Sequence, residues 1–557
     1  FMVIGKTRSR ARDLALAVAV AVLVLGSSAV AALEGEPTSR KLFSETVLRA
    51  TLDRAGEMGV VRSRAVQPNL ELLLETDGTP RDLTAEDRLT LNLFDDLQLV
   101  AVLDRVEPSY GGGFTWVGQV QDEPVSAVTL VVNEGMMAGT VVSPQGLFRI
   151  GYAGNGVHVV HEIDPSAFPP EAEPIPVEQP EGTAADAVPA ATADDGSVID
   201  VMVVYTPAAR AAANPISMQN LINVAVAETN QSYLYSGITQ RLNLVYTTEV
   251  AYTETSFSAA LYDLTGTNDG KMDIVHTLRN TYHADEVVLL INDPEYCGLA
   301  WLMQNVSTSF QDHAFAVVNW QCATGYYSFG HELGHNMGAQ HDHSAVTKYN
   351  QAEGAYSYSY GYVNTSRRWR TVMAYNDACG DLDFYCERIP YWSNPDVYYG
   401  GYPTGASNAD NQLTLDNTAW TVANFRVSVG PPSTPTGLVA TAVSPVRIDL
   451  SWTDASSDET GFRIERRIGA ASWLPLVTLG ANTTSYPDTG LTPETTYSYR
   501  VIAYNAYGDS DPSATASATT PPVIIGPLVY DGYLVDDDNA GGTSGNGNGV
   551  LECGEAV

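Results

Sequence analysis

Three of the nine histidines in this chain fall within the eleven residues HELGHNMGAQH. If residues 329–337 form a helix, His331 and His335 project from one face about one turn apart, close enough to bind one metal ion. Gly338 is then expected to adopt the left-handed conformation that ends the helix and turns the chain back. This reversal delivers His341 as a third ligand, so the stretch predicts one metal site made of three imidazoles.

Three neutral imidazoles leave the fourth position of a tetrahedral ion open, which is typical of a catalytic zinc site rather than a structural one. Zinc held there is expected to lower the pKa of a bound water towards ~7 and to polarise a substrate carbonyl. Glu332 is placed to accept the proton of that water, and Gly334 is expected to let another chain segment approach the helix closely. The pattern H-E-x-x-H-x-x-G-x-x-H therefore predicts an endopeptidase that acts on proteins or peptides.

The extended motif resembles that of the metzincin zinc metalloendopeptidases, which combine it with a methionine turn. A candidate turn follows at residues 371–375, TVMAY, and the resemblance implies that Met373 forms the apolar floor beneath the metal. Asp342, directly after the third histidine, is similar to the reprolysin-like (adamalysin-type) branch, where this residue supports the site through hydrogen bonds. Tyr375 is instead similar to the tyrosine of astacins and serralysins, which ligates zinc and stabilises the oxyanion. Simple packing is the alternative role for Tyr375.

The resemblance runs from about residue 199 to 426 and extends to bacterial secreted proteases such as the peptidyl-Asp metalloendopeptidases. The stretch CGLAWL at 297–302 belongs to it as well. By the same resemblance, Arg388 lies where metzincins build the wall of the pocket for the residue after the cut. A cation there would favour Asp or Glu in the substrate, whereas a surface arginine is the ordinary alternative.

The elements around the motif indicate an α/β metzincin (zincin-like) catalytic domain at residues 197–428. Residues 199–206 and 285–293 are apolar enough for interior strands, and a helical period follows between them. Strands mixed with helices indicate a sheet covered by helices. The strand AFAVVN, at 314–319, is expected to border the cleft and to pair with a peptide substrate.

Residues 32–163 alternate between apolar and polar side chains, as at 89–103, and predict a β-rich unit. Residues 164–196 are rich in proline, alanine and acidic residues, which is typical of an extended, protease-accessible linker. This order predicts a removable prodomain, with a permanent accessory domain as the alternative. The prodomain has no cysteine, so it cannot block zinc with a thiolate.

Residues 431–520 carry apolar side chains at period two within short runs, which predicts an all-β sandwich. The stretch resembles a fibronectin type III module, with Tyr497 in the tyrosine-corner position. Such a module is expected to bind matrix, polysaccharide or cell-surface ligands. Residues 521–557 are expected to be the start of a truncated C-terminal segment. Calcium (Ca2+) at Asp536–Asp538 is a second metal hypothesis, against an ordinary solvated linker.

Residues 1–31 have the features of a bacterial-type signal peptide: a basic start, the apolar run LALAVAVAVLVLG and the small-residue pattern AVA. We therefore expect a secreted, extracellular protein with no membrane insertion in its mature form. The formal net charge of −36 repels phosphate backbones and excludes nucleic acid as an expected partner.

Five cysteines are consistent with an oxidising compartment. Cys297, Cys322, Cys379 and Cys386 can form two disulfides in three pairings, of which 297 with 322 and 379 with 386 is the simplest. Cys553 is left over.

Two other functions compete with a secreted zinc protease. One is an adhesive or substrate-binding surface protein with a vestigial zinc site. The other is a zinc hydrolase of small amides. The sequence keeps the three histidines together with Glu332. This argues against a vestigial zinc site, because a site without activity has no need of a general base.

Overall fold

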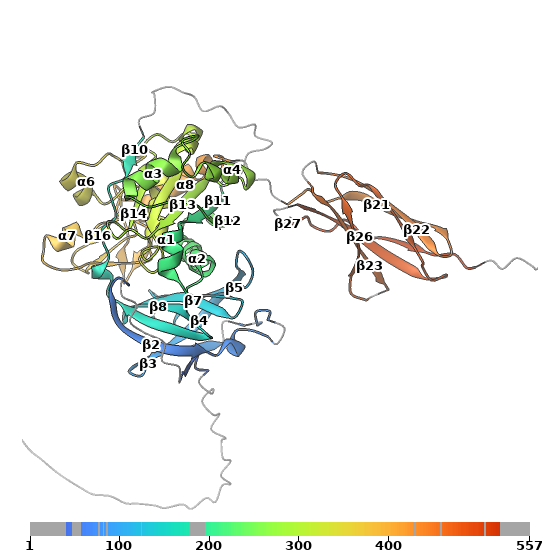
Figure 1. The fold of residues 1–557 in the computed structure, drawn as a ribbon, viewed down its shortest axis with the longest axis horizontal. Coiled ribbons are helices and arrows are strands. Elements are labelled where there is room, and N and C mark those ends of the chain that lie inside the picture. Colours follow the sequence, from blue (N-terminus) through green and yellow to red (C-terminus); the bar gives the residue numbers. More distant parts are fainter. Residues whose placement is uncertain are drawn as a thin grey trace, which may run out of the picture.

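The computed structural model describes residues 40–46, 57–177, 195–426 and 431–523, apart from residues 76, 77, 82, 85, 86, 124, 457, 458, 470, 506 and 507. The predicted signal peptide, residues 178–194 of the predicted linker, the segment 524–557 with its calcium candidates, and Cys553 lie outside these residues. Figure 1 shows a β-rich unit (blue), a mixed unit of helices and strands (green to yellow) against it, and a sandwich (orange) set apart.

The N-terminal unit is one antiparallel sheet of nine strands in the order β1-β2-β9-β8-β7-β6-β5-β4-β3. The backbone N–H of Leu42 donates to the carbonyl of Thr90 in β3, and the N–H of Thr90 donates to the carbonyl of Arg40. These bonds join the residues just before β1 to β3, so the two edges of the sheet meet and it curls around an apolar core. The alternation seen in the sequence places one face of each strand in that core. The strands are β1 (Phe43–Glu45), β2 (Val60–Pro68), β3 (Arg88–Phe94), β4 (Leu97–Pro108), β5 (Phe114–Val120), β6 (Ala127–Asn133), β7 (Met136–Ser143), β8 (Gly146–Gly154) and β9 (Val157–Ile163).

The central unit contains a six-stranded sheet in the order β10-β14-β15-β13-β11-β12. All neighbouring strands are parallel except β14 and β15, which are antiparallel. Strands β13, β14 and β15 are buried along their whole length, and β11 is buried except at its two ends, as expected from their apolar runs. The strands are β10 (Ile175–Pro176), β11 (Val198–Tyr205), β12 (Arg241–Glu249), β13 (Glu286–Ile291), β14 (Gly298–Leu302) and β15 (Phe315–Asn319).

The helices of this unit pack on the sheet or lie in the loops beyond it (Figure 1). The long helix α2 contacts both β12 and the zinc-motif helix α5. The helices are α1 (Pro207–Ala213), α2 (Met218–Ser236), α3 (Phe257–Thr265), α4 (Asp273–Thr281), α5 (Ser328–Asn336), α6 (His343–Tyr349), α7 (Asp377–Gly380) and α8 (Asn411–Val422).

The strand expected to border the cleft does not do so. Residues 315–319 form β15, which is enclosed between β13 and β14. The strand on the cleft side is β14, whose outer edge is paired by β10. The apolar run of β15 is equally suitable for a fully buried strand, and only the sheet order separates the two positions.

Residues 164–177 also differ from the expected exposed linker. Phe168, Glu171 and Ala172 are buried against the central unit, and β10 adds to its sheet. Prolines here do not signal a free chain, because proline fits an edge strand that uses few backbone donors.

The N-terminal sheet docks on α2. Strands β5, β6 and β7 contact this helix, and Val131 and Ala138 pack on Val224. The side chain of Thr140 bonds the buried carboxylate of Glu228 on α2. The β-rich unit and the catalytic unit therefore share a packed interface.

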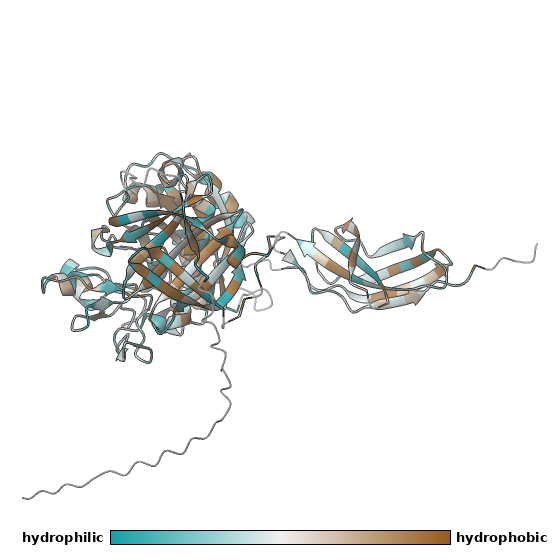
Figure 2. Cartoon of the chain, turned by 90° about the horizontal axis from the view of Figure 1, so that it is seen from below, coloured by the Kyte–Doolittle hydropathy of each residue, from teal (hydrophilic) through white to brown (hydrophobic). Residues whose placement is uncertain are grey.

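The C-terminal module is a β-sandwich whose inward side chains include Trp452, Phe462 and Tyr499. The hydroxyl of Tyr497 accepts a hydrogen bond from the backbone N–H of Thr492, as in a tyrosine corner. Figure 2 shows the alternation of hydrophobic and hydrophilic residues along its strands. One sheet contains β21 (Thr436–Ser444), β22 (Arg447–Thr453) and β25 (Ser485–Thr489), and the other β24 (Leu474–Gly480), β23 (Gly461–Ile468), β26 (Thr496–Asn505), β27 (Gly508–Asp509) and β28 (Ala516–Thr519).

The simplest disulfide pairing is confirmed: Cys297 bonds Cys322, and Cys379 bonds Cys386. Within the described part of the chain, no helix has both the length and the apolar character needed to cross a bilayer.

Candidate metal centre

Three imidazoles converge at the end of helix α5. His331 and His335 lie four residues apart on α5, and Gly338 follows the helix with a φ of +87°, which turns the chain back to His341. The three Nε2 atoms are 3.0–3.2 Å apart. Ligands at ~2.0–2.1 Å from a tetrahedral zinc would be about 3.3 Å apart, so the three nitrogens fit one zinc ion.

The hydrogen bonds of the Nδ1 atoms determine the tautomers of these histidines. Each Nδ1 faces an oxygen acceptor at 2.8–2.9 Å, namely the carbonyls of Val372 and Ala339 and the side-chain oxygen of Gln351. Each Nδ1 therefore carries the proton, and each Nε2 presents a lone pair. Three lone pairs that face one another repel unless a cation lies between them, so this donor set fits a metal.

All three histidines are fully buried. Burial lowers the pKa of His331 and His341 well below its usual range and that of His335 to about 3. The imidazoles are therefore neutral at physiological pH, which is the form that ligates zinc. Among the described residues, the metal-binding group contains these three histidines and no carboxylate within 4.8 Å.

Glu332 follows His331 on α5, and its carboxylate lies against Gly298 at the start of β14. It is fully buried, and neither of its carboxylate oxygens bonds another protein group. Burial raises the pKa of Glu332 well above its usual range, and the negative charge of Glu171 adds to this rise. A Cβ at Gly298 would lie 2.3 Å from the Oε1 atom of Glu332, so the start of β14 needs glycine to leave room for the carboxylate.

The two glycines within the motif have different structural roles. A Cβ at Gly334 would lie 2.8 Å from the ring of Trp392 and 3.0 Å from the Sδ atom of Met373. A Cβ at Gly338 would lie 2.5 Å from that of Ala355. Gly334 therefore allows the close approach expected from the sequence, and Gly338 provides both the positive φ and the space for the turn.

The residues of the candidate methionine turn lie directly against α5. Met373 is fully buried, and its Sδ atom lies against Gly334, the glycine between His331 and His335 in the sequence. Asp342 accepts hydrogen bonds from the backbone N–H groups of Ser344, in the first turn of α6, and of Tyr375. It thereby joins the residue after the third histidine to the methionine turn.

Tyr375 packs its ring on His341, with ring centroids 3.9 Å apart. Its hydroxyl donates to the carbonyl oxygens of Glu171 and Ala172, at 2.8 and 3.0 Å. The hydroxyl therefore faces the cleft, where it bonds the segment that fills it.

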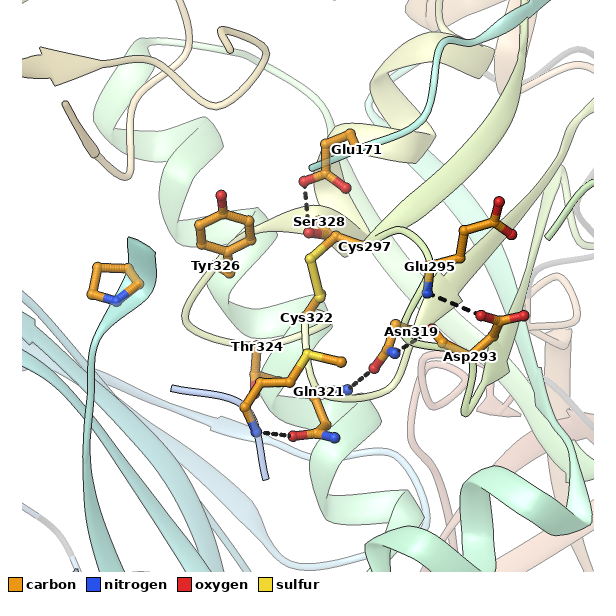
Figure 3. The surroundings of a disulfide bond; sticks show 12 residues. Glu171, Asp293, Glu295, Cys297, Asn319, Gln321, Cys322, Thr324, Tyr326 and Ser328 are labelled. Atoms are coloured by element: carbon orange, nitrogen blue, oxygen red, sulfur yellow. Dashed lines mark hydrogen bonds between the residues drawn. A yellow bond between two sulfur atoms is a disulfide. The ribbon is translucent and has the colours of Figure 1, made fainter. Parts of the chain in front are cut away.

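Next to the metal centre lies a pocket that we call the acid pocket. Ser328 and Arg388 bind the carboxylate of Glu171, and Tyr326 and Arg370 line the same pocket. Arg388 is only 5% exposed, so it is not a surface arginine. Its Nη1 atom donates to Oε1 of Glu171 at 2.6 Å and to the carbonyl of Tyr326 at 2.8 Å. Figure 3 shows Glu171 directed at Ser328 beside the Cys297–Cys322 disulfide, with the ring of Tyr326 nearby.

Sequence reasoning missed Arg370, Ser328 and Glu171. Arg370 directly precedes the methionine turn, and this position was a signal that it lies near the site. Its guanidinium is buried and donates to Ala374 and Tyr326. Glu171 had no comparable signal, because it is one of many acidic residues in a proline-rich stretch.

Comparison with known proteins identifies both folded units that follow the N-terminal sheet. The metallo-peptidase family M12 matches residues 195–392, and the fibronectin type III domain matches residues 433–519. A peptidyl-Asp metalloendopeptidase of Stenotrophomonas maltophilia is 39% identical over 368 residues, covering 62% of this chain and 84% of that protein. Another, of Xanthomonas campestris, is 38% identical over 363 residues, covering 61% of this chain and 82% of that protein. The chain therefore belongs to the M12 metallopeptidases, as a zinc metalloendopeptidase that carries a fibronectin type III module.

Proposed function

We propose that this chain is a secreted endopeptidase in which His331, His335 and His341 hold zinc and Glu332 is the general base. The observation that carries the proposal is the convergence of three Nε2 lone pairs beside a buried carboxylate that has no protein partner. A purely structural zinc site has no use for such a carboxylate.

Zinc, when bound, supplies Lewis acidity and lowers the pKa of water at its open position. Glu332 takes the proton from the attacking water on its free carboxylate oxygens. Glu332 then delivers that proton to the departing amine. The hydroxyl of Tyr375 faces the cleft, and we propose that it donates to the substrate carbonyl oxygen as negative charge develops there.

We further propose that the enzyme prefers an acidic side chain next to the scissile bond. The buried guanidiniums of Arg370 and Arg388 support this preference, since they lie in one pocket beside the metal centre. The relatives in Stenotrophomonas and Xanthomonas are named for action at peptidyl-Asp bonds. Bidentate pairing of a guanidinium with a carboxylate gives both geometry and charge selection.

The remaining assignments also belong to the proposal. Residues 32–163 act as a prodomain, and residues 178–194 contain the site of its removal. The two disulfides are compatible with export, which the predicted signal peptide would direct. The fibronectin type III module binds matrix, polysaccharide or cell-surface ligands. Calcium at Asp536–Asp538 stays a prediction.

Replacing the general base tests the proposal most directly. Glu332→Gln is expected to lower casein or gelatin hydrolysis by roughly 10²–10⁴-fold, because the amide cannot accept the proton. Elemental analysis should still find one zinc per chain, since the three histidines are unchanged. Undiminished hydrolysis by the variant would reject the role of Glu332.

A further inference from the structure

The segment of residues 168–177 runs through the groove of the protease domain beside β14. The carbonyl of Pro170 accepts from the N–H of Cys297, and the N–H of Ala172 donates to the carbonyl of Gly298, both at 2.9 Å. Further along, Ile175 and Pro176 of β10 pair with the last two residues of β14. A peptide substrate that adds a strand to this edge must displace the segment.

The Glu171 side chain enters the acid pocket as an acidic substrate side chain would. Its Oε1 atom accepts from Arg388 at 2.6 Å and from the Ser328 hydroxyl at 2.7 Å. Phe168 anchors the same segment, with its ring 4.6 Å from that of Tyr326. Glu171 is buried, and Figure 3 shows its carboxylate directed at Ser328.

The charges of the pocket explain why a carboxylate belongs there. Arg370 and Arg388 are both buried, and Glu171 is the acidic side chain paired with Arg388. In the described part of the chain, Arg370 has no carboxylate partner. Arg370 is held instead by the carbonyls of Cys386 and Ala374 and by tyrosine hydroxyls. The buried guanidinium of Arg388 without an anion would carry a large desolvation cost, so the empty pocket would select a negatively charged group.

The space on either side of the segment indicates that it divides one groove. A cavity of about 550 Å³ and another of about 220 Å³ share Pro170, Glu171, Tyr375 and Asp377 in their walls. Removing residues 168–177 would join these two cavities beside the metal centre. The groove is therefore filled at the place where a substrate must bind.

We propose, on the basis of the protease function proposed above, that Glu171 is an intramolecular substitute for the acidic side chain of a substrate and that residues 168–177 keep the full-length enzyme inactive by occupying its groove. The segment acts on substrate recognition and not as a metal ligand, because among the described residues the group of ligand atoms that lie within 4.8 Å of one another contains the three histidines and not Glu171 or Glu173. It also occupies the Tyr375 hydroxyl, which bonds the carbonyls of Glu171 and Ala172.

The first test compares two neutralising variants of the full-length chain. Glu171→Gln removes the charge that pairs with Arg388, whereas Glu173→Gln removes an exposed charge two residues away. With a quenched-fluorescence peptide that contains Asp, Glu171→Gln should act at least tenfold faster than the unaltered chain. Glu173→Gln should match the unaltered chain. Equal rates for the unaltered chain and Glu171→Gln would overturn the proposal.

The second test uses the segment as a free peptide. A peptide of residues 166–177 should inhibit the Glu171→Gln chain competitively with substrate, and the same peptide carrying Glu171→Gln should be at least tenfold weaker. Equal inhibition by the two peptides would overturn the role of the carboxylate.

Hydrogen exchange on the unaltered chain gives a reading that needs no variant. A saturating acidic peptide, but not its amide counterpart, should speed exchange at the N–H groups of Ala172 and Cys297. Unchanged exchange with both peptides would contradict displacement of the segment.

If the zinc-loaded chain never hydrolyses a peptide, even after residues 178–194 are cut, the protease function itself fails, and this inference fails with it.

Discussion

The metal centre and the acid pocket lie next to each other in one groove, yet they are assembled in different ways. The three metal-binding histidines come from eleven consecutive residues, on one helix and the turn that follows it. The acid pocket draws Ser328, Arg370 and Arg388 from separate parts of the domain and takes its carboxylate from Glu171, outside the protease domain proper. Local helical geometry therefore builds the first site, whereas tertiary packing builds the second.

The two sites also differ in what completes them. The histidines present three lone pairs that only a cation can satisfy. The acid pocket presents the buried cation of Arg388, which an anion stabilises, and the chain itself supplies that anion as Glu171. Disabling each site should therefore have a different signature, and the following predictions separate them.

Removing the metal should have the largest effect. Chelation of the processed enzyme is expected to lower hydrolysis of every peptide by about 10³-fold or more, because the Lewis acid acts on all substrates alike. Added zinc should restore the rate. A chelator effect confined to acidic peptides would contradict the division between the two sites.

Removing the cation of the acid pocket should act on one class of substrate. Arg388→Met in the processed enzyme is expected to lower kcat/KM for an Asp peptide by about 10²-fold, since truncating one partner of a buried charge pair costs about 2–5 kcal/mol. A Leu peptide should be much less affected, and zinc content should not change. Arg367→Met, at an exposed arginine, is the matched control. Equal cleavage of Asp, Leu and Lys peptides by the unaltered enzyme would remove the acid preference.

Glu228 is a buried carboxylate that forms no salt bridge within the described part of the chain, and it offers a contrast to Glu171. Burial raises the pKa of Glu228, at the interface of α2 with the N-terminal sheet, from 4.5 to about 7. The folded state then binds a proton that the unfolded state has lost, so this stability is fully present below pH 4.5 and is lost as pH rises through 7. The loss is up to about 3 kcal/mol.

Urea unfolding midpoints of the full chain, measured between pH 5 and 8, give the change of stability with pH. Glu228→Gln should flatten it, because the amide does not titrate. A slope that persists unchanged in the variant would assign the pH dependence to other groups.

The smallest effect is expected from the packing of α5. Gly334→Ala gains about 1 kcal/mol of helix propensity but forces a Cβ against Trp392 and Met373, and overpacking costs about 1–3 kcal/mol. We expect a net loss of about 1 kcal/mol and a lower melting temperature with zinc bound. Gly380→Ala, whose added Cβ meets only one atom at 3.8 Å, should have little effect. An unchanged melting temperature for Gly334→Ala would show that the methionine turn shifts at little cost to make room for the added Cβ.

Much of the fold was predictable because it depends on local patterns. Period-two alternation predicted both β-rich units, and the buried runs at 199–206 and 285–293 became β11 and β13. The position of β15 was not predictable, because a fully apolar strand suits either an inner position or one beside the cleft. Composition predicts an exposed linker over residues 164–196, but residues 164–177 are packed on the domain, because composition does not reveal a groove that matches a segment.

The sequence by itself determined the metal centre, since helical spacing and one glycine turn bring His331, His335 and His341 together with Glu332 beside them. Only the tertiary structure decided the acid pocket and its occupant. The ion pair of Arg388 with Glu171 joins residues 217 positions apart, and no local rule relates two such distant charges. Its physical basis is burial: once the fold removes the guanidinium of Arg388 from water, a carboxylate stabilises it.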